Sequence, residues 1–416
     1  MAADGQVPPT SGLLRASLTL AAGGVLAQAL PLLLGPLLTR LFTPTEFGQY
    51  HLFAAVSANL AVVACGRYEF ALPMAADAGE ADSLRRLAWR ILGAVTVLSA
   101  LGAAGWAALG AGAWVVWLPL AVAAAGAASL ATLWAMRAQR FRALAAARVL
   151  QYGGAAVAQA AAGWAGAGLG GLIVAPIVAT LASAVVLGLP WTGRRADAPA
   201  LSEVARRFRD FPLLNTPHAF AGALQDTLSL ALVAAALGPA AAGFWGLALR
   251  YLKAPATLVG AAVSQALYPR LAGGGVTRET RQAVRRVMGL LALLAAPLVV
   301  ALWVAGPWAF GALFGPGWGE AGELGRALAL YIGLHFVASP LAVVTMAWQG
   351  QAWALKFALL GQMAFVLALA AGLHRGSLGG AGWAVSGAMT LYFGTYFWRL
   401  ATWPLAPITK VEQSHP

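Results

Sequence analysis

Twelve apolar runs dominate the chain, and they restrict its fold more than any other feature. They begin at roughly residues 13, 50, 88, 113, 143, 169, 212, 239, 287, 327, 354 and 378. Each run is about 20 residues long, the length that an α-helix needs to cross the hydrocarbon core of a bilayer. Only 10% of the residues are charged and the mean hydropathy is +0.75, whereas soluble domains are about 25% charged. We predict an all-α membrane protein with twelve transmembrane helices.

The distribution of basic residues predicts the orientation of these helices. When the loops are assigned alternately to the two sides, 21 Lys and Arg residues fall on one side, against Arg40, Arg326 and Arg375 on the other. Basic loops stay in the cytoplasm, so both termini are predicted to be cytoplasmic. The net charge of +13 is thereby explained as a topology signal, and no nucleic-acid partner is expected.

An internal sequence repeat predicts two structurally similar halves. The shared residues lie 195 positions apart and are Pro44, Gly48 and Tyr50 in the first copy and Pro239, Gly243 and Trp245 in the second. Each copy precedes an even-numbered span, as expected for two six-helix lobes in the same orientation. We predict lobes at residues 1–190 and 212–416, joined by a basic cytoplasmic linker at 191–211 with a short surface helix from Ser202.

Two cations in the middle of one span are the strongest candidates for a binding site. Arg250 and Lys253 are three residues apart and share a helix face. Asp226 and Arg250 are each twelve residues from a turn near Gly238, which places both about 18 Å from it. Asp226 therefore either forms a structural ion pair with Arg250 or balances the charge of a cationic site that takes an anionic ligand.

The stretch "GRYEF" (66–70) puts two more charges inside an apolar helix. Arg67 is expected about 9 Å inside the cytoplasmic end of the second span, where it is either a cavity cation or a side chain that snorkels to the interface. Arg67 and Glu69 are separated by about 200° around a helix and cannot pair with each other. Glu69 is then either the partner of a neighbouring helix or a protonatable coupling group.

Other polar residues are weaker candidates. Arg40, at the periplasmic end of the first span, is either a phosphate contact on the exit side or an interface anchor. Thr43 and Glu46 have the spacing of a capping box, with Pro44 at the first helical position. His218 and Asn215 are placed to hydrogen-bond sugar hydroxyls, although a packed and satisfied histidine is the commoner situation.

Four stretches together carry a family resemblance: "LLTRLFTPTEFGQY", "GRYEFALP", "FRDFPLLNTPHAF" and "GFWGLALRYLKAPATLVGAAVSQALYPRLA". They resemble the Wzx-type polysaccharide and O-antigen flippases of the multidrug/oligosaccharidyl-lipid/polysaccharide exporter superfamily. The resemblance implies a MATE-like two-lobe transporter in the bacterial inner membrane. It also implies transport of undecaprenyl-diphosphate-linked oligosaccharides to the periplasmic leaflet by alternating access, for lipopolysaccharide, capsule or exopolysaccharide. Implied partners are membrane lipids, a polysaccharide polymerase and a chain-length regulator.

Several chemistries have no support in the sequence. "GAGLGG" (166–171) lies between apolar spans with no strand before it and is a turn, and no Walker-type "GK[ST]" or H-E-x-x-H motif occurs. Cys65 is the single cysteine, so no internal disulfide is expected. We expect no catalytic residue, metal or cofactor, with coupling to H⁺ or Na⁺ left open. The alternatives are an exporter of lipid II or drugs, or a membrane glycosyltransferase or polymerase.

Overall fold

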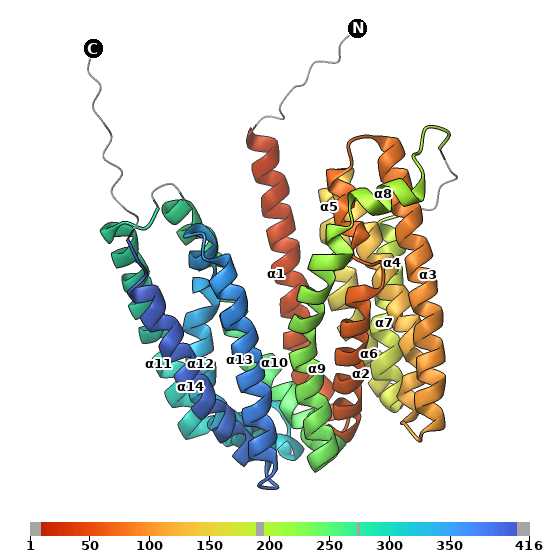
Figure 1. The fold of residues 1–416 in the computed structure, drawn as a ribbon. Helices are drawn as coiled ribbons and strands as arrows, with labels where there is room; N and C mark the ends of the chain where they lie inside the picture. Colours follow the sequence, from red (N-terminus) through yellow and green to blue (C-terminus); the bar gives the residue numbers. More distant parts are fainter. Residues whose placement is uncertain (1–9, 189–194, 273–274, 406–416) are drawn as a thin grey trace, which may run out of the picture. The chain divides into compact units, whose positions relative to one another are not determined.

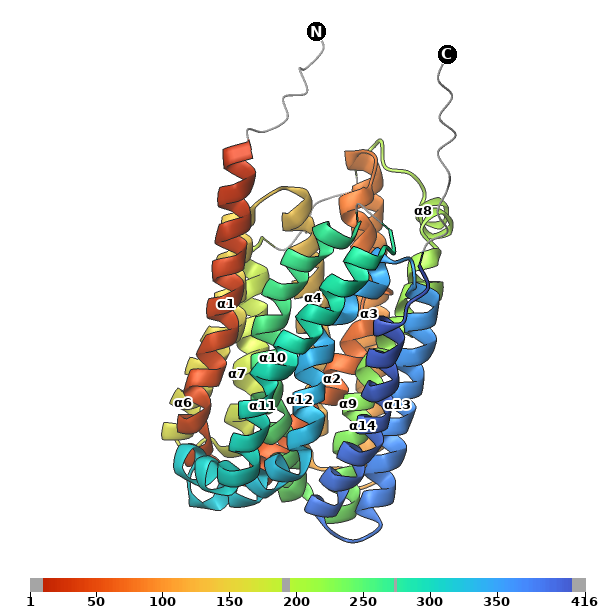
Figure 2. The ribbon, with the colours of Figure 1, turned by 90° about the vertical axis from the view of Figure 1, so that its left-hand side faces the viewer.

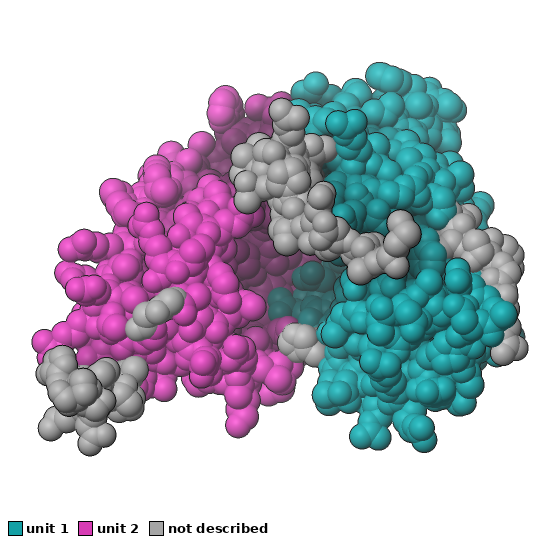
Figure 3. Space-filling model, turned by 90° about the horizontal axis from the view of Figure 1, so that it is seen from above, with its two compact units in different colours: residues 1–243 teal, residues 244–416 magenta. Residues whose placement is uncertain are grey.

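A computed structural model describes residues 10–188, 195–272 and 275–405 of the chain (Figure 1). The described residues form helices and turns without any β-strand. The chain divides into two compact units, residues 1–243 and 244–416, which are coloured separately in Figure 3. This division falls within the predicted carboxyl-terminal lobe. The two six-helix lobes and their linker remain a prediction.

Unit 1 holds the elements up to the start of α10. They are α1 (Thr10–Leu41), α2 (Pro44–Val63), η1 (Tyr68–Met74), α3 (Ala78–Ala108), η2 (Ala113–Trp117), α4 (Leu118–Arg137), α5 (Phe141–Arg148), η3 (Val149–Gly154), α6 (Ala155–Trp164), α7 (Gly168–Val186), α8 (Leu201–Arg207), η4 (Phe211–Asn215) and α9 (Thr216–Leu237). The short helix α8 confirms the one expected in the linker. Within this unit, α2 packs against α9, α3 against α4, and α7 against both α4 and α6.

Unit 2 contains most of α10 (Pro239–Ala272) and the helices that follow it. These are α11 (Arg278–Phe314), η5 (Pro316–Trp318), α12 (Gly319–Ala347), α13 (Gln351–Leu373) and α14 (Leu378–Ala401). Helix α12 packs against α11 and α14, and α14 also lies beside α13 (Figure 2). The side of α11 that carries Leu293, Val304 and Trp308 is strongly exposed and apolar, which suits contact with lipid tails.

The protein is a multi-pass membrane protein. Among the described residues, eight helices are long and apolar enough to cross a membrane, or nine if α2 and η1 form one broken span. Helical segments cover all twelve predicted runs, with α5, η3 and α6 together covering the fifth. The count of twelve spans and the cytoplasmic position of the termini remain predictions.

Small residues allow the helices of unit 1 to pack closely. Helix α4 buries six alanines and Gly126 on the sides that face its neighbours. In a bilayer, helices associate through van der Waals contact rather than water exclusion, so small side chains that let backbones approach are favoured. One core of unit 1 gathers Leu72, Leu84, Leu130 and Val204, and therefore joins the spans to α8.

The Pro and Gly residues of the two repeat copies lie against each other within unit 1. A Cβ built on Gly48 would lie 1.7 Å from the carbonyl oxygen of Pro239, and one on Gly243 would lie 2.1 Å from that of Pro44. The first turns of α2 and α10 thus cross in backbone contact, and the crossing is reciprocal. The Thr43 capping box is confirmed, because the Thr43 amide donates to the Glu46 carboxylate at 2.8 Å and the Glu46 amide donates back to Thr43 Oγ1 at 3.3 Å.

Candidate functional site

The chain breaks its helix at the "GRYEF" stretch. Helix α2 ends at Val63, Gly66 and Arg67 adopt left-handed φ values of 61° and 62°, and η1 continues at an angle of 54°. Our expectation of a continuous helix through Arg67 and Glu69 is therefore wrong. Two successive residues with positive φ cannot belong to a right-handed helix, and Gly66 enters this conformation without steric cost.

The break brings together two residues that the sequence analysis selected separately. Arg67 Nε donates to Asn215 Oδ1 at 2.8 Å, across 148 positions of sequence. The guanidinium also lies over the ring of Phe70, 4.3 Å from its centroid. Asn215 is the last residue of η4, so the bond joins the α2–η1 turn to the start of α9. Asn215 thereby contacts a cation, and its contact with sugar hydroxyls remains a prediction.

Glu69 is the buried acid of this region. It is 2% exposed, and Ser129 of α4 donates to its Oε1 at 3.5 Å. Its Oε2 is buried and has no hydrogen-bond partner among the described residues. A buried carboxylate with an unsatisfied oxygen is costly, whereas a neutral carboxyl is tolerated more easily. The partner on a neighbouring helix and the protonatable group are thus both compatible with the geometry.

Unit 2 holds the second pair of predicted cations, on α10. Arg250 is exposed and Lys253 is partly buried, with its Nζ 5.9 Å from the centroid of the Tyr331 ring. Tyr331 is in turn 5.9 Å from His335, ring to ring, one turn along α12. Sequence reasoning missed Tyr331 and His335. Their spacing of four residues inside an apolar span was the available signal, since it places both on one helix face.

The remaining predicted residues are dispersed. Asp226 is exposed on α9, in unit 1, whereas its proposed partner Arg250 lies in unit 2. Their pairing therefore remains a prediction. Arg40 is exposed at the last turn of α1, just before the Thr43 cap. The backbone of His218 lies in α9, while its side chain is outside the described part of the chain.

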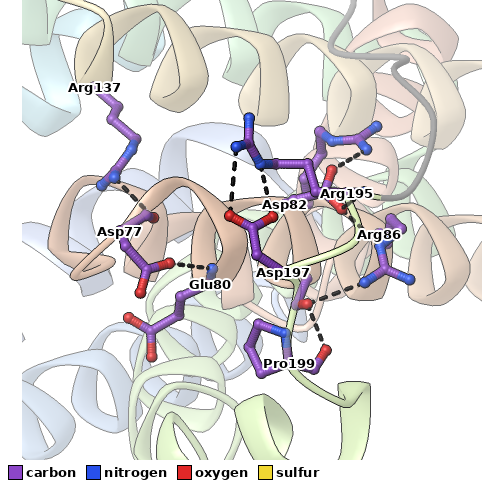
Figure 4. Close-up of polar contacts among 10 residues, drawn as sticks. Asp77, Glu80, Asp82, Arg86, Arg137, Arg195, Asp197 and Pro199 are labelled. Carbon is purple, nitrogen blue, oxygen red and sulfur yellow. Dashed lines mark hydrogen bonds and ion pairs between the residues drawn. The ribbon is translucent and has the colours of Figure 1, made fainter.

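A buried ionic cluster at the start of α3 was also missed (Figure 4). Asp82 forms ion pairs with Arg85 and, at 3.0 Å, with Arg86, and the side chains of Asp82 and Arg85 are almost fully buried. Arg195, from the linker region, pairs with Asp197 at 3.0 Å, and its guanidinium holds the pKa of the Asp197 carboxyl below the usual range. The sequence "EADSLRRL" contained the signal for the first part, because Asp82 precedes two arginines at three and four positions.

The fold of the protein is shared with known membrane transporters and a lipid flippase. The chain is similar to an inward-facing multidrug resistance MATE family transporter of the MOP superfamily, with a TM-score of 0.68, 13% sequence identity and coverage of 90% of this chain and 94% of that one. It is equally similar to the lipid II flippase MurJ in an inward closed conformation, with a TM-score of 0.68, 11% identity and coverage of 93% and 88%. The predicted MATE-like all-α fold is confirmed.

The sequence then identifies the family. Residues 37–323, more than half of the chain, match the polysaccharide biosynthesis protein family, and the chain belongs to that family. No curated protein matches the sequence at a significant level. The resemblance to the polysaccharide flippases is supported by this membership and by the MOP-superfamily fold.

Proposed function

We propose that the protein is a flippase for undecaprenyl-diphosphate-linked oligosaccharides. It moves them from the cytoplasmic to the periplasmic leaflet of the bacterial inner membrane by alternating access. The product serves the synthesis of O-antigen, capsule or exopolysaccharide, and the partners are the lipid-linked sugar, membrane lipids, a polymerase and a chain-length regulator. Family membership and the fold shared with exporters and a lipid flippase support this proposal.

The charge of unit 2 is the observation that carries the proposal. Arg250 and Lys253 lie on one face of an apolar helix, in the interior of α10. The acidic residues among the described part of unit 2 are Glu279, Glu320 and Glu323. Glu279 and Glu320 lie in the first turns of α11 and α12, and Glu323 is the fifth residue of α12. The middle of α10 therefore carries two positive charges with no acidic residue beside them on that helix. A diphosphate headgroup compensates such a charge, whereas a cationic drug is repelled by it.

The proposed roles follow from these charges. Arg250 and Lys253 bind the diphosphate centrally, Arg67 binds it on the cytoplasmic side, and Arg40 contacts it on the exit side. His218 takes sugar hydroxyls, and Asp226 balances the central charge when substrate is absent. Glu69 is the coupling group. Its burial beside Ser129 suits the gain and loss of a proton, with Na⁺ as the other candidate ion.

A reconstituted system tests the proposal directly. In liposomes that contain the purified protein, a fluorescent undecaprenyl-diphosphate oligosaccharide should move from the inner to the outer leaflet, where an external quencher reduces its fluorescence. In protein-free liposomes, the molecules in the inner leaflet should stay protected from the quencher. Repeating the assay with a proton gradient or a sodium gradient alone identifies the coupling ion. Transport of a cationic drug or of lipid II, without transport of the oligosaccharide, would support the alternative exporters instead.

The predicted topology has its own test. A cysteine placed at Arg206 on the exposed side of α8, in a chain whose buried Cys65 is replaced by serine, should react with a membrane-impermeant maleimide only after the cells are opened. The reason is the positive-inside rule, which keeps the basic 191–211 segment in the cytoplasm. Reaction in intact cells would show that the predicted orientation is wrong, and the cytoplasmic and exit sides of the proposed site would then have to be exchanged.

A further inference from the structure

The segment between the predicted lobes is bound to α3 at its beginning. Ser83 Oγ donates to the carbonyl oxygen of Pro199 at 2.7 Å, and the Arg195 amide donates to Asp82 Oδ2 at 3.4 Å (Figure 4). The linker backbone passes so close that a Cβ on Gly79 would lie 2.8 Å from the carbonyl oxygen of Asp197. We call residues 195–215 the strap.

The anchoring point on α3 is a cluster of ion pairs formed within the helix itself. Asp82 accepts hydrogen bonds from Arg85 and Arg86 as well as from the strap. Arg86 also donates to Ser83 Oγ at 3.0 Å, and that hydroxyl is the one that holds Pro199. The buried ion cluster therefore fixes the orientation of the hydroxyl that binds the strap.

The middle of the strap is held by three further contacts. Arg207 of α8 pairs with Glu80 at 2.8 Å, and the Glu80 side chain is almost fully buried while that of Arg207 is largely exposed. Tyr68, the residue after Arg67, donates its hydroxyl to the carbonyl oxygen of Ala205 at 3.2 Å. Val204 is 1% exposed in the core that includes Leu72 of η1. The strap is thus tied to α3 and to η1 together.

The end of the strap is Asn215, the acceptor for Arg67 Nε. The Arg67 guanidinium also lies over the Phe70 ring and interacts electrostatically with Glu69, while its two terminal nitrogens form no hydrogen bond with the described residues. Arg67 has a left-handed backbone, which a residue with a side chain keeps only where its surroundings hold it. The strap supplies those surroundings through Tyr68 and Asn215.

We infer that the strap is a positioning element of the proposed transport site: it holds Asn215 and the Arg67 turn so that the guanidinium is presented to a phosphate-containing ligand. Asn215 and Arg207 act through Arg67 and do not contact the ligand themselves. The role of Asn215 is therefore positioning rather than sugar recognition. This inference rests on the proposed function for the identity of the ligand.

Affinity for inorganic pyrophosphate, measured by calorimetric titration of the full-length detergent-solubilised protein, tests the inference. Arg67→Ala should remove most of the binding to the cytoplasmic-side site. Arg207→Ala and Asn215→Ala should each weaken binding by roughly threefold to tenfold, as is usual when a coupled but non-contacting residue is changed. Arg206→Ala is the matched control, because it removes the same charge from the exposed side of α8 and should leave the affinity close to that of the wild type.

The double variant separates positioning from a direct or purely electrostatic role. If Arg207 acts through Arg67, Arg67→Ala/Arg207→Ala should bind no more weakly than Arg67→Ala, and Arg207→Lys should restore most of the affinity. Additive losses, or equal effects of Arg206→Ala and Arg207→Ala, would overturn the inference. Thermal unfolding of each variant shows whether a loss arises from unfolding, and Arg207 is exposed enough that its removal should leave the fold intact.

Two outcomes distinguish the inference from the proposed function. Binding that is lost in Arg67→Ala but unchanged in Asn215→Ala and Arg207→Ala would contradict the strap alone. Wild-type protein that binds no pyrophosphate would contradict the diphosphate-binding role, and the inference with it.

Discussion

Replacing Lys253 by alanine should reduce transport of a diphosphate-linked oligosaccharide by about 10- to 100-fold, because a hydrogen bond to a charged group contributes about 1.5–3 kcal/mol. Arg250→Ala should have an effect of the same size. Both residues lie on one face of α10, in a unit whose described acidic residues are confined to the starts of α11 and α12. The measurement is the quenching assay in liposomes, together with surface polysaccharide in cells that lack the wild-type gene.

Two comparisons show what this result means. Lys356→Ala removes the same charged group from an exposed position near the start of α13 and should transport normally. Arg250→Lys should lose less than Arg250→Ala if charge alone is required, and nearly as much if two nitrogens must contact the phosphate. Normal export by a well-expressed Lys253→Ala protein, combined with instability of Asp226→Ala, would instead favour a structural ion pair.

Gly48→Ala should destabilise the protein by at least about 1–3 kcal/mol, the usual cost of overpacking a tight contact. The added Cβ would lie 1.7 Å from a backbone oxygen, which cannot rotate away as a side chain can. Gly243→Ala should behave in the same way, because its Cβ would lie 2.1 Å from the carbonyl oxygen of Pro44. The thermal unfolding temperature in detergent should therefore fall for both variants.

Gly102→Ala is the control for this experiment. Gly102 lies inside α3, and apart from its own stretch of helix no atom lies within 4 Å of an added Cβ. The substitution should therefore be neutral or stabilise the helix by up to about 1 kcal/mol. Equal unfolding temperatures for Gly48→Ala and Gly102→Ala would mean that the α2–α10 crossing is looser than the structure shows.

Local sequence determined the features that depend on a residue and its near neighbours along the chain. Apolar runs predicted the membrane-spanning helices, since length and hydropathy decide whether a helix is stable in lipid. The spacing of Thr43 and Glu46 predicted a capping box that the structure confirms. The repeat of Pro and Gly at 44–48 and 239–243 was also visible, and so were the mid-span cations Arg250 and Lys253.

Tertiary structure decided which of these features meet. The two repeat copies are 195 residues apart, and hydropathy contains nothing that places Gly48 on the Pro239 carbonyl. The Arg67 turn was misjudged because an apolar run favours a helix, whereas Gly66 and the packing around Tyr68 stabilise a break. The bond from Arg67 to Asn215 spans 148 residues and depends on a strap held by Asp82, Glu80 and Ser83. Hydropathy and helical spacing predict whether a residue lies in a helix and on which face. A long-range polar pair forms only where tertiary packing brings the two side chains within hydrogen-bond distance.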